Sequence, residues 1–515
     1  MKHIFTRSRA FAAAAAAVLL LSLSLSACAN TAGTGASGNT ASGNTGSAQL
    51  RDTFTFGIAT EVYNLDPFTS TTADARAVYF NIYEGLTEVT TDGQFVPCLA
   101  SDIEMSDDAK TYTFTLRDGV KFHNGNDMTM DDVLWSVQNA IDTGMTGYSS
   151  IASFEALSDK ELKIELSVPD TGFLACLTCA IVPAGSTDLA LSPIGTGPFY
   201  MSDYAEQDHL TLSRFDDYWG EKAKLSAVEI RFVANSAELL MAFEGGTIDG
   251  FDSSSGVASQ LDPETATLHT RNSNSVQLLA LNNARAPFDD IRVRQALSYA
   301  VNADEIIETV DYGFGVPVGS ALIPGLSVYY NEELADYYPT DADKAKELLT
   351  EAGASGLEFT ITVPSNYQVH VDTAQVIVNE LAAIGVNAKI EQVDWATWLE
   401  SVYSGRNYEA TIISVDGSLA YPTAFLSRYV SDAHNNFVNF NSAEYDDVYK
   451  KAVAATDENE KTALFKEAQE VLTKEAASVF IQDISSINVY SKSFDGFAGY
   501  PLYAYDFSVI YATGN

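Results

Sequence analysis

The chain of 515 residues carries a formal net charge of −40 at pH 7, from 29 basic and 69 acidic side chains. Nucleic acid and anionic lipid surfaces repel such a chain, so neither is expected as a partner. The length exceeds the about 250 to 300 residues that one hydrophobic core supports, and it predicts two or three lobes with a cleft between them.

The first 27 residues are predicted to be a secretory signal peptide. Basic residues occupy three of the first nine positions, and the apolar run from Phe11 to Leu25 is shorter than a membrane span of about 20 residues. The run leads into Leu25-Ser26-Ala27-Cys28, which resembles a bacterial lipobox, so we expect lipidation of Cys28. An ordinary signal peptide followed by an incidental cysteine is the alternative.

Residues 28–50 are predicted to form a flexible tether. Small and polar residues without charge fill positions 29–49, which leaves too little apolar surface to offset the entropy of ordering. Such a segment reaches ~25 Å root-mean-square. We therefore expect an extracytoplasmic protein that acyl chains anchor to the cell membrane, on the outer face in a monoderm bacterium or in the periplasm of a diderm one.

Alternating apolar residues and helical spacing together predict an α/β architecture. Strands are predicted at residues 54–56, 112–116, 162–166, 228–232, 359–363 and 386–390. Helices are predicted at residues 293–301, 341–353 and 373–384, with a further helix that begins at Thr129. Asp289 is interpreted as the N-cap of the helix at 293–301.

Three cysteines follow Cys28, at positions 98, 176 and 179, so at least one is left unpaired within the chain. The sequence "CLTC" at 176–179 raises the question of a zinc or redox site. A zinc site needs four ligands, and neither a second cysteine pair nor a nearby histidine supplies them. We predict buried small residues or a local disulfide here, and no metal.

Seven segments together resemble the family 5 solute-binding proteins, the extracytoplasmic receptors of peptide and nickel ABC transporters. The segments follow the family order and lie between residues 50 and about 500. They are "LDP" (65–67), "NIYEGL" (81–86), "TYTFTLRDGVKFHNGNDMTMDDV" (111–133), "PIGTGPF" (193–199), "GTIDG" (246–250), "LALNNARAPFDDIRVRQALSYAVN" (279–302) and "DADKAKELLTEAG" (341–353).

The resemblance implies a periplasmic-binding-protein-like type II fold, with two lobes, hinge crossings near 279–283 and 481–486, and an extra subdomain on the first lobe. Lobe I is expected to comprise residues 51–87, 191–280 and 485–515, the subdomain residues 88–190, and lobe II residues 281–484. The implied function is capture of a small solute, in the first place an oligopeptide, by a monomeric receptor that delivers it to ABC permease subunits. A nickel chelate, haem or an oligosaccharide is the alternative ligand.

Within these segments, several residues that suggest chemistry are interpreted as structural. His123 in "FHNG" lies in a hairpin with the turn pairs Asp118-Gly119 and Asn124-Gly125, and it is expected to be a fold element rather than a lone metal ligand. Gly195 and Gly197 are expected to permit close approach of two chain segments rather than to bind phosphate.

The ligand site is predicted from a stretch that the peptide-binding members use to pair an aspartate with the ligand's α-amino group. The corresponding stretch here is "VDGSLAYPTAFL", residues 415–426. Alignment on Pro422 without a gap places Ser418 at the aspartate position, whereas a short register shift would place Asp416 there. Both residues are therefore candidates. Whether the site can bury a free amino terminus depends on which of the two occupies the aspartate position.

Aromatic and amide side chains complete the predicted ligand site. The candidates are Tyr63 and Asn64, just before "LDP", and Trp395, Trp398 and Tyr421 in the second lobe. Each aromatic ring also has a role in core packing as its alternative, because large apolar rings usually pack.

A secreted hydrolase is the alternative from another functional class. The sequence contains no G-x-S-x-G elbow, no S-x-x-K and no H-E-x-x-H motif, and its histidines are isolated from one another. We therefore predict no catalytic residues and no cofactor, and a function in binding alone.

Overall fold

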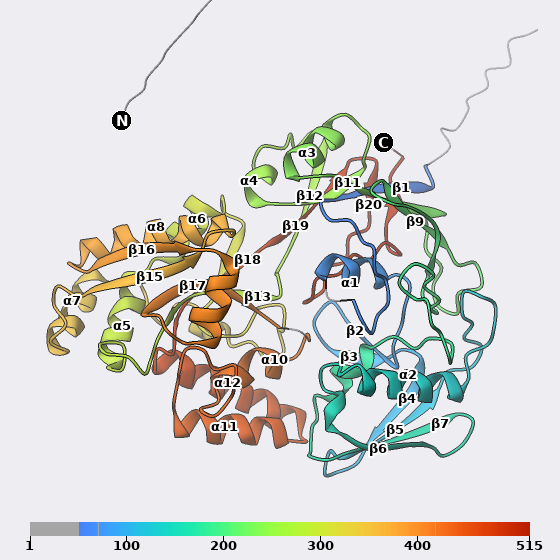
Figure 1. Ribbon diagram of the computed structural model, residues 1–515, viewed down its shortest axis with the longest axis horizontal. Helices are drawn as coiled ribbons and strands as arrows, with labels where there is room; N and C mark the ends of the chain where they lie inside the picture. The colour runs from blue at the N-terminus through green and yellow to red at the C-terminus, as the bar shows by residue number, and fades with distance from the viewer. Residues whose placement is uncertain (1–50, 71, 418, 515) are drawn as a thin grey trace, which may run out of the picture. The chain divides into compact units, whose positions relative to one another are not determined.

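Two mixed sheets and a smaller four-stranded sheet organise the chain (Figure 1). The computed structural model describes residues 51–70, 72–417 and 419–514. Cys28, the signal peptide and the predicted tether fall outside these residues.

The first sheet has seven strands, in the order β12 (Ala266–Arg271), β19 (Ser486–Ser491), β11 (Gly250–Ser253), β1 (Thr53–Ile58), β10 (Ala227–Phe232), β9 (His209–Arg214) and β8 (Phe199–Ala205). The second has six strands, in the order β14 (Gly315–Pro317), β18 (Val479–Ile484), β13 (Ser275–Leu281), β17 (Ala410–Asp416), β15 (Glu358–Pro364) and β16 (Asn387–Val393). The predicted α/β architecture is confirmed.

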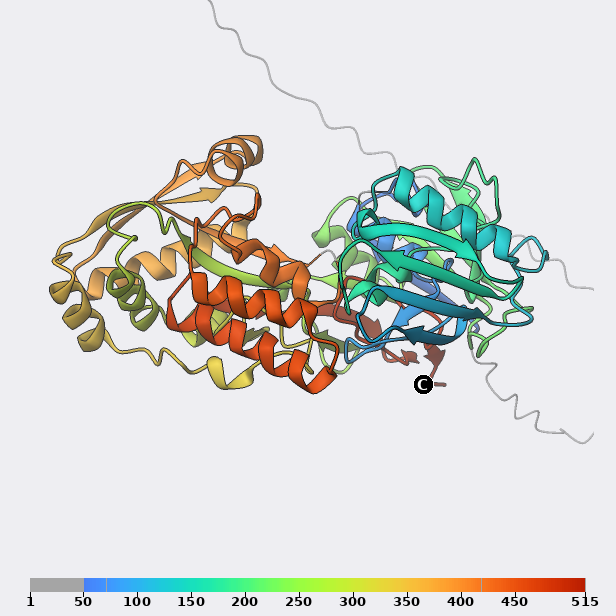
Figure 2. The same ribbon diagram turned by 90° about the horizontal axis from the view of Figure 1, so that it is seen from below.

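The smaller sheet runs β4 (Ala100–Met105), β5 (Thr111–Leu116), β7 (Glu161–Leu166) and β6 (Ile151–Ala156). Two-stranded pairs are β2 (Thr87–Val89) with β3 (Phe95–Pro97), and β20 (Phe494–Asp495) with β21 (Tyr511–Ala512). Helix α2 (Met130–Asp142) lies along the four-stranded sheet in Figure 2, with Val133, Val137 and Ala140 buried.

The remaining α-helices are α1 (Ala73–Tyr79), α3 (Ser236–Glu244), α4 (Ser255–Ala258), α5 (Ile291–Ala300), α6 (Ala303–Val310), α7 (Ala342–Glu351), α8 (Gln368–Ala383), α9 (Trp395–Thr397), α10 (Pro422–Leu426), α11 (Ala443–Ala454) and α12 (Glu458–Lys474). None of the helices in the described part of the chain is long and apolar enough to cross a membrane.

The six strands predicted from alternation correspond to β1, β5, β7, β10, β15 and β16. One helix cap was wrong: Asp290, not Asp289, precedes α5, and its carboxylate accepts a hydrogen bond of 2.9 Å from the Arg292 N–H. Asp290 has the extended backbone that an N-cap requires, whereas the Asp289 N–H already bonds the Arg285 carbonyl in the preceding turn.

The chain passes from the first sheet to the second at residues 272–274 and returns at Ser485. The first passage was predicted at 279–283, and that position is wrong. Residues 276–281 are all buried and form the centre of β13. This strand hydrogen bonds to β17 on one side and to β18 on the other. The short polar segment Asn272-Ser273-Asn274 makes the crossing instead.

Two glycines allow a close contact between two of the quoted segments. A Cβ atom on Gly195 would lie 2.0 Å from the Ile82 carbonyl oxygen, and one on Gly197 would lie 2.6 Å from the Asn81 carbonyl oxygen. The close approach that the sequence predicted is therefore confirmed. His123 joins the same contact, because its ring accepts from the Gly195 N–H at 3.2 Å and lies 3.0 Å from the Gly197 carbonyl.

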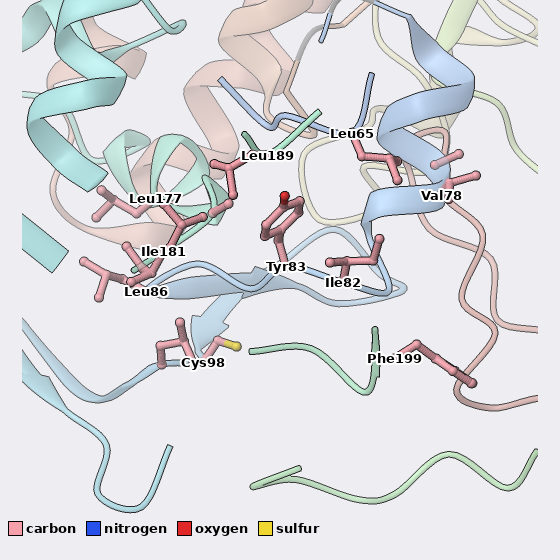
Figure 3. Packing of buried hydrophobic residues seen from close by; sticks show 14 of the residues in the cluster. Leu65, Val78, Ile82, Tyr83, Leu86, Cys98, Leu177, Ile181, Leu189 and Phe199 are labelled. Atoms are coloured by element: carbon pink, nitrogen blue, oxygen red, sulfur yellow. The ribbon is translucent and has the colours of Figure 1, made fainter. Parts of the chain in front are cut away.

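Figure 3 shows the hydrophobic core beside this contact, in which Tyr83 points toward Leu189. Ile82, Tyr83 and Leu86 belong to one buried cluster with Cys98, Leu177, Ile181 and Phe199. The three cysteines of the described residues are free, and burial raises the pKa of the Cys176 and Cys179 thiols to about 12. The thiols thus serve as packing groups, and the local disulfide that the sequence left open is not formed.

A carboxyl group is buried in the same region. Glu84 accepts hydrogen bonds from the Thr196 hydroxyl at 2.7 Å, the Tyr218 hydroxyl at 2.6 Å and the Trp219 indole at 2.8 Å. Burial raises the pKa of Glu84 to about 7, although all three donors oppose that rise. The side chain joins "NIYEGL" to "PIGTGPF" and to the segment that follows β9.

Candidate ligand-binding site

Three parallel strands of the second sheet end at one edge, and two of the predicted site residues, Trp395 and Asp416, follow them directly. Strand β15 is parallel to β16 on one side and to β17 on the other. Their carboxyl ends lead to Tyr367, Trp395 and Asp416, which are all exposed. Ligands of open α/β sheets bind outside the carboxyl ends of the strands, so this edge is the candidate site of the second sheet.

The two tryptophans take different positions. Trp395 is 36% exposed, whereas Trp398 is 3% exposed and donates its indole N–H to the Thr411 hydroxyl at 2.9 Å. Their rings stack at a centroid distance of 5.2 Å and an interplanar angle of 5°. The buried ring of Trp398 therefore stacks on one face of the Trp395 ring, and of the two only Trp395 presents surface to a ligand.

Tyr367 was missed by the sequence analysis. Its ring meets Trp395 edge to face, with centroids 5.3 Å apart, and it is 40% exposed. It occupies the N-cap position of α8, which begins at Gln368, five residues before the predicted start, without a side-chain cap. The signal was available, since Tyr367 follows the predicted strand 359–363 just as Trp395 follows the predicted strand 386–390.

Asp416 ends β17 with an exposed side chain. Its backbone carbonyl accepts a hydrogen bond of 3.1 Å from the Arg428 guanidinium, and its carboxylate takes part in none of the ion pairs of the described chain. The carboxylate is thus available to a cation. Ser418, the other candidate for this role, lies outside the described residues.

Tyr421 is buried at a contact between the second sheet's helices and the segment 170–178. Its ring lies edge to face with Tyr329 at 5.7 Å and Phe465 at 6.0 Å, and it is 5% exposed. A Cβ atom on Gly172 would lie 2.1 Å from this ring. Tyr421 therefore packs in the manner of a core residue, which was its alternative role.

The first sheet contributes Tyr63 and Asn64 beyond the carboxyl end of β1. Tyr63 is 65% exposed. Asn64 shapes the loop, because its side-chain oxygen accepts from the Asp66 N–H at 2.9 Å and its amide group donates to the Thr69 hydroxyl at 3.3 Å. Strands β10 and β11 run parallel to β1, so this loop also lies at a carboxyl edge.

A polar cluster at the end of β11 was also missed by the sequence analysis. The Tyr503 hydroxyl lies 2.9 Å from an Asp252 oxygen and 3.1 Å from an Asp74 oxygen, and it contacts the Tyr505 hydroxyl. Burial raises the pKa of Asp252 to about 6. The aromatic repeat in "YPLYAYDF", residues 500–507, was the only signal, and nothing in its spacing pointed to β11.

No group of three or more His, Cys, Asp or Glu side chains in residues 51–70, 72–417 and 419–514 is placed to hold a metal ion.

Comparison with known proteins identifies the family. The model of the bacterial extracellular solute-binding proteins, family 5, matches residues 94–437. The chain belongs to this family. It is therefore a solute-binding protein of the extracytoplasmic space, and the family consists of binding proteins rather than enzymes.

Two family 5 relatives show how widely ligands differ among similar chains. Heme-binding protein A of Haemophilus influenzae is 30% identical over 457 residues, which cover 79% of this chain and 82% of that protein. The dipeptide-binding protein of Escherichia coli is 29% identical over 494 residues, which cover 86% of this chain and 91% of that protein.

Solved structures agree with the fold of this family 5 member. The ABC transporter-associated periplasmic binding protein DppA from Helicobacter pylori, in complex with the peptide STSA, superposes with a TM-score of 0.72 at 27% identity and covers 90% of this chain and 98% of its own. HbpA2 from Haemophilus parasuis superposes with a TM-score of 0.82 at 24% identity, with 90% and 100% covered, and supports the fold alone.

Proposed function

We propose that this family 5 protein is the solute-capturing component of an ABC importer and that its solute is a short peptide with a free amino terminus. The carboxylate of Asp416 is the observation that carries the peptide assignment, since it is exposed at the carboxyl edge and has no ion-pair partner among the described residues. The ammonium group of a peptide needs such a partner when it leaves water. Delivery to permease subunits follows from the role of the family.

The neighbouring rings fit the same ligand. The Trp398 ring stacks on one face of Trp395, and the Tyr367 ring packs edge to face with Trp395. Such a wall offers apolar surface to peptide side chains of varied shape without a dedicated hydrogen bond. The relatives that bind dipeptide or the peptide STSA support this choice of ligand.

Calorimetry with the purified extracytoplasmic chain tests the assignment. We expect saturable binding of alanyl-alanine and trialanine, weaker binding of their N-acetylated forms, and no cleavage of either peptide by mass spectrometry. Binding of haem or of a nickel chelate in place of both peptides would contradict the peptide assignment while leaving the importer role intact. Cleavage of the peptides would contradict the assignment to binding alone.

We further propose residues 1–27 as the signal peptide, residues 28–50 as the tether and residues 88–190 as a subdomain of lobe I. The positions of the crossings support a lobe II that begins after residues 272–274 and ends before Ser485, with the rest of residues 51–515 in lobe I.

Lipid anchoring predicts that Cys28→Ala releases the protein from the membrane. Without the thiol no diacylglyceryl group can be attached, and the acyl chains supply the anchoring free energy of about 0.8 kcal/mol per buried methylene. We expect the variant in the medium or the periplasm, with peptide affinity unchanged, when cell fractions are compared by immunoblot. Retention of the variant in the membrane fraction would contradict the lipoprotein assignment; Ser26→Ala serves as the control that keeps the thiol.

A further inference from the structure

Residues 419–421, which come shortly after β17, connect the hydrophobic cores of the two large sheets. Leu419 packs both against the cluster that contains β1 of the first sheet and against the cluster that contains part of β13 of the second. Val89 of β2 and Ala175 belong to the latter cluster, although both come before the first crossing at 272–274. The two sheets are therefore joined by a packed contact as well as by the two crossings of the chain.

Tyr421 lies at the centre of this contact. Its ring meets Tyr329 and Phe465 of the second sheet's side edge to face. The Phe95 ring of β3, which precedes the first crossing, lies 6.4 Å from it between centroids, where β3 and α10 face one another in Figure 1. A Cβ atom on Gly172 would lie 2.1 Å from Cε1 of the Tyr421 ring. Because the neighbouring rings restrict Tyr421, the fit depends on the missing side chain at position 172.

Gly172 belongs to a turn that is fixed to the four-stranded sheet. The Asp170 N–H donates to the Ala109 carbonyl at 3.1 Å, and the Asp170 carbonyl accepts from the Tyr112 hydroxyl of β5 at 2.5 Å. The Asp170 carboxylate accepts from the Gly172 N–H at 2.8 Å and closes the turn. Burial raises the pKa of Asp170, and the Gly172 N–H and the Lys461 ammonium of α12 oppose that rise. Opposite charges thus face each other across the contact.

The segment that carries Tyr421 begins at the candidate ligand carboxylate. Asp416 ends β17, and the Gly417 N–H donates to the Asn274 carbonyl at 3.1 Å. The Gly417 carbonyl accepts from the Asn274 side-chain amide at 3.3 Å, and Asn274 belongs to the first crossing. Asp416, the crossing and Tyr421 are therefore parts of one bonded and packed segment, in which a displacement at the ligand carboxylate also changes the fit of the ring.

We propose, on the basis of the proposed function, that Tyr421 and Gly172 form a latch that holds the two proposed lobes closed over the ligand site. A solute captured between two lobes makes contacts on both sides only in the closed arrangement, so an interaction that favours this arrangement raises the affinity for the solute. The latch supplies such an interaction without touching the ligand. Tyr421 is in this sense a positioning residue.

Gly172→Ala tests the latch. Gly172 has φ −87° and ψ 0°, which alanine also adopts, so the added methyl group acts through the Tyr421 ring. Small-angle scattering of the ligand-free extracytoplasmic chain is expected to show a larger radius of gyration in the variant. Calorimetry is expected to show an affinity for alanyl-alanine about tenfold lower or more. Gly256→Ala is the matched control: a Cβ atom there meets only the Tyr312 ring, at 3.5 Å, so neither quantity should change.

The same substitution in a Tyr421→Ala background separates the latch from a general loss of stability. Without the ring the methyl group has room, so Gly172→Ala should have no further effect on either quantity. Leu419→Ala removes the contact with both clusters without a clash, and it should also raise the radius of gyration; it serves as the test should Gly172→Ala fold poorly.

An unchanged radius of gyration in either folded variant would overturn the latch, and so would an equal effect of Gly172→Ala with and without the Tyr421 ring. Because the scattering measurement uses no ligand, failure of the unmodified chain to bind alanyl-alanine would contradict the proposed function alone.

Discussion

Asp416→Asn is expected to weaken the binding of free-amine peptides by ~10²-fold or more. An uncompensated buried charge costs about 3 to 5 kcal/mol, and each 1.4 kcal/mol is a factor of ten in affinity. The asparagine keeps the shape of the side chain but cannot balance the charge of the ammonium group. Because the side chain is exposed at the end of β17, the fold should tolerate the change. Calorimetry with alanyl-alanine measures the effect.

N-acetyl-alanyl-alanine completes a double-mutant cycle, whose coupling term isolates the amine-to-carboxylate interaction from general destabilisation. The acetylated peptide should bind weakly to the unmodified protein and lose little more in the variant. Asp394→Asn is the matched control: Asp394 follows β16 at the same edge but caps α9, accepting from the Thr397 N–H at 3.0 Å. Equal losses of peptide affinity in Asp416→Asn and Asp394→Asn would indicate a long-range electrostatic effect. A coupling near zero would mean that Asp416 does not pair with the peptide's amino group.

Glu84→Ala is expected to lower the free energy of unfolding by about 3 to 5 kcal/mol. The hydroxyls of Thr196 and Tyr218 and the indole of Trp219 would lose their common acceptor, and each unsatisfied buried group costs about 1 to 3 kcal/mol. Urea unfolding followed by fluorescence measures the change. A loss below about 1 kcal/mol would mean that water replaces the carboxyl group.

The pH dependence of stability tests the same group through Glu84→Gln. The folded protein releases this proton near pH 7 and the unfolded chain near 4.5, so the contribution of Glu84 is fully present below pH 4.5 and is lost as pH rises to about 7. The glutamine variant should lose stability less steeply over that range than the unmodified chain. Glu104→Gln, at an exposed position, should leave the slope as it is.

Local signals in the sequence were enough for the six predicted strands and for most of the predicted helix starts. Phe54 and Phe56 alternate with polar residues because one face of β1 packs in the core, and Asp341 caps α7 through the N–H groups of Asp343 and Lys344. The crossing was misplaced because the apolar run of β13 has no local feature that distinguishes a sheet centre from a hinge. Pairing with β17 and β18 decides it, and such pairing joins residues far apart in the chain.

The candidate site was predictable where a residue follows a recognisable strand. Trp395 and Asp416 were found in that way, and Tyr367 could have been. The different exposure of Trp395 and Trp398 could not be predicted. It depends on Thr411 of β17, whose hydroxyl accepts a hydrogen bond from the Trp398 indole N–H.

The strand order of the first sheet constrains how the protein emerges from the cell. Strand β19 lies between β12 and β11, with Val489 paired to Leu268 on one side and to Phe251 on the other. In a chain exported from its N-terminus, the second sheet is complete once residue 484 has crossed the membrane, whereas β12 has no partner strand until residues 486–491 follow. The portion of the protein that is secreted first is therefore the last to close its sheet, and a chain truncated before β19 would reach the surface with an open strand edge that invites aggregation.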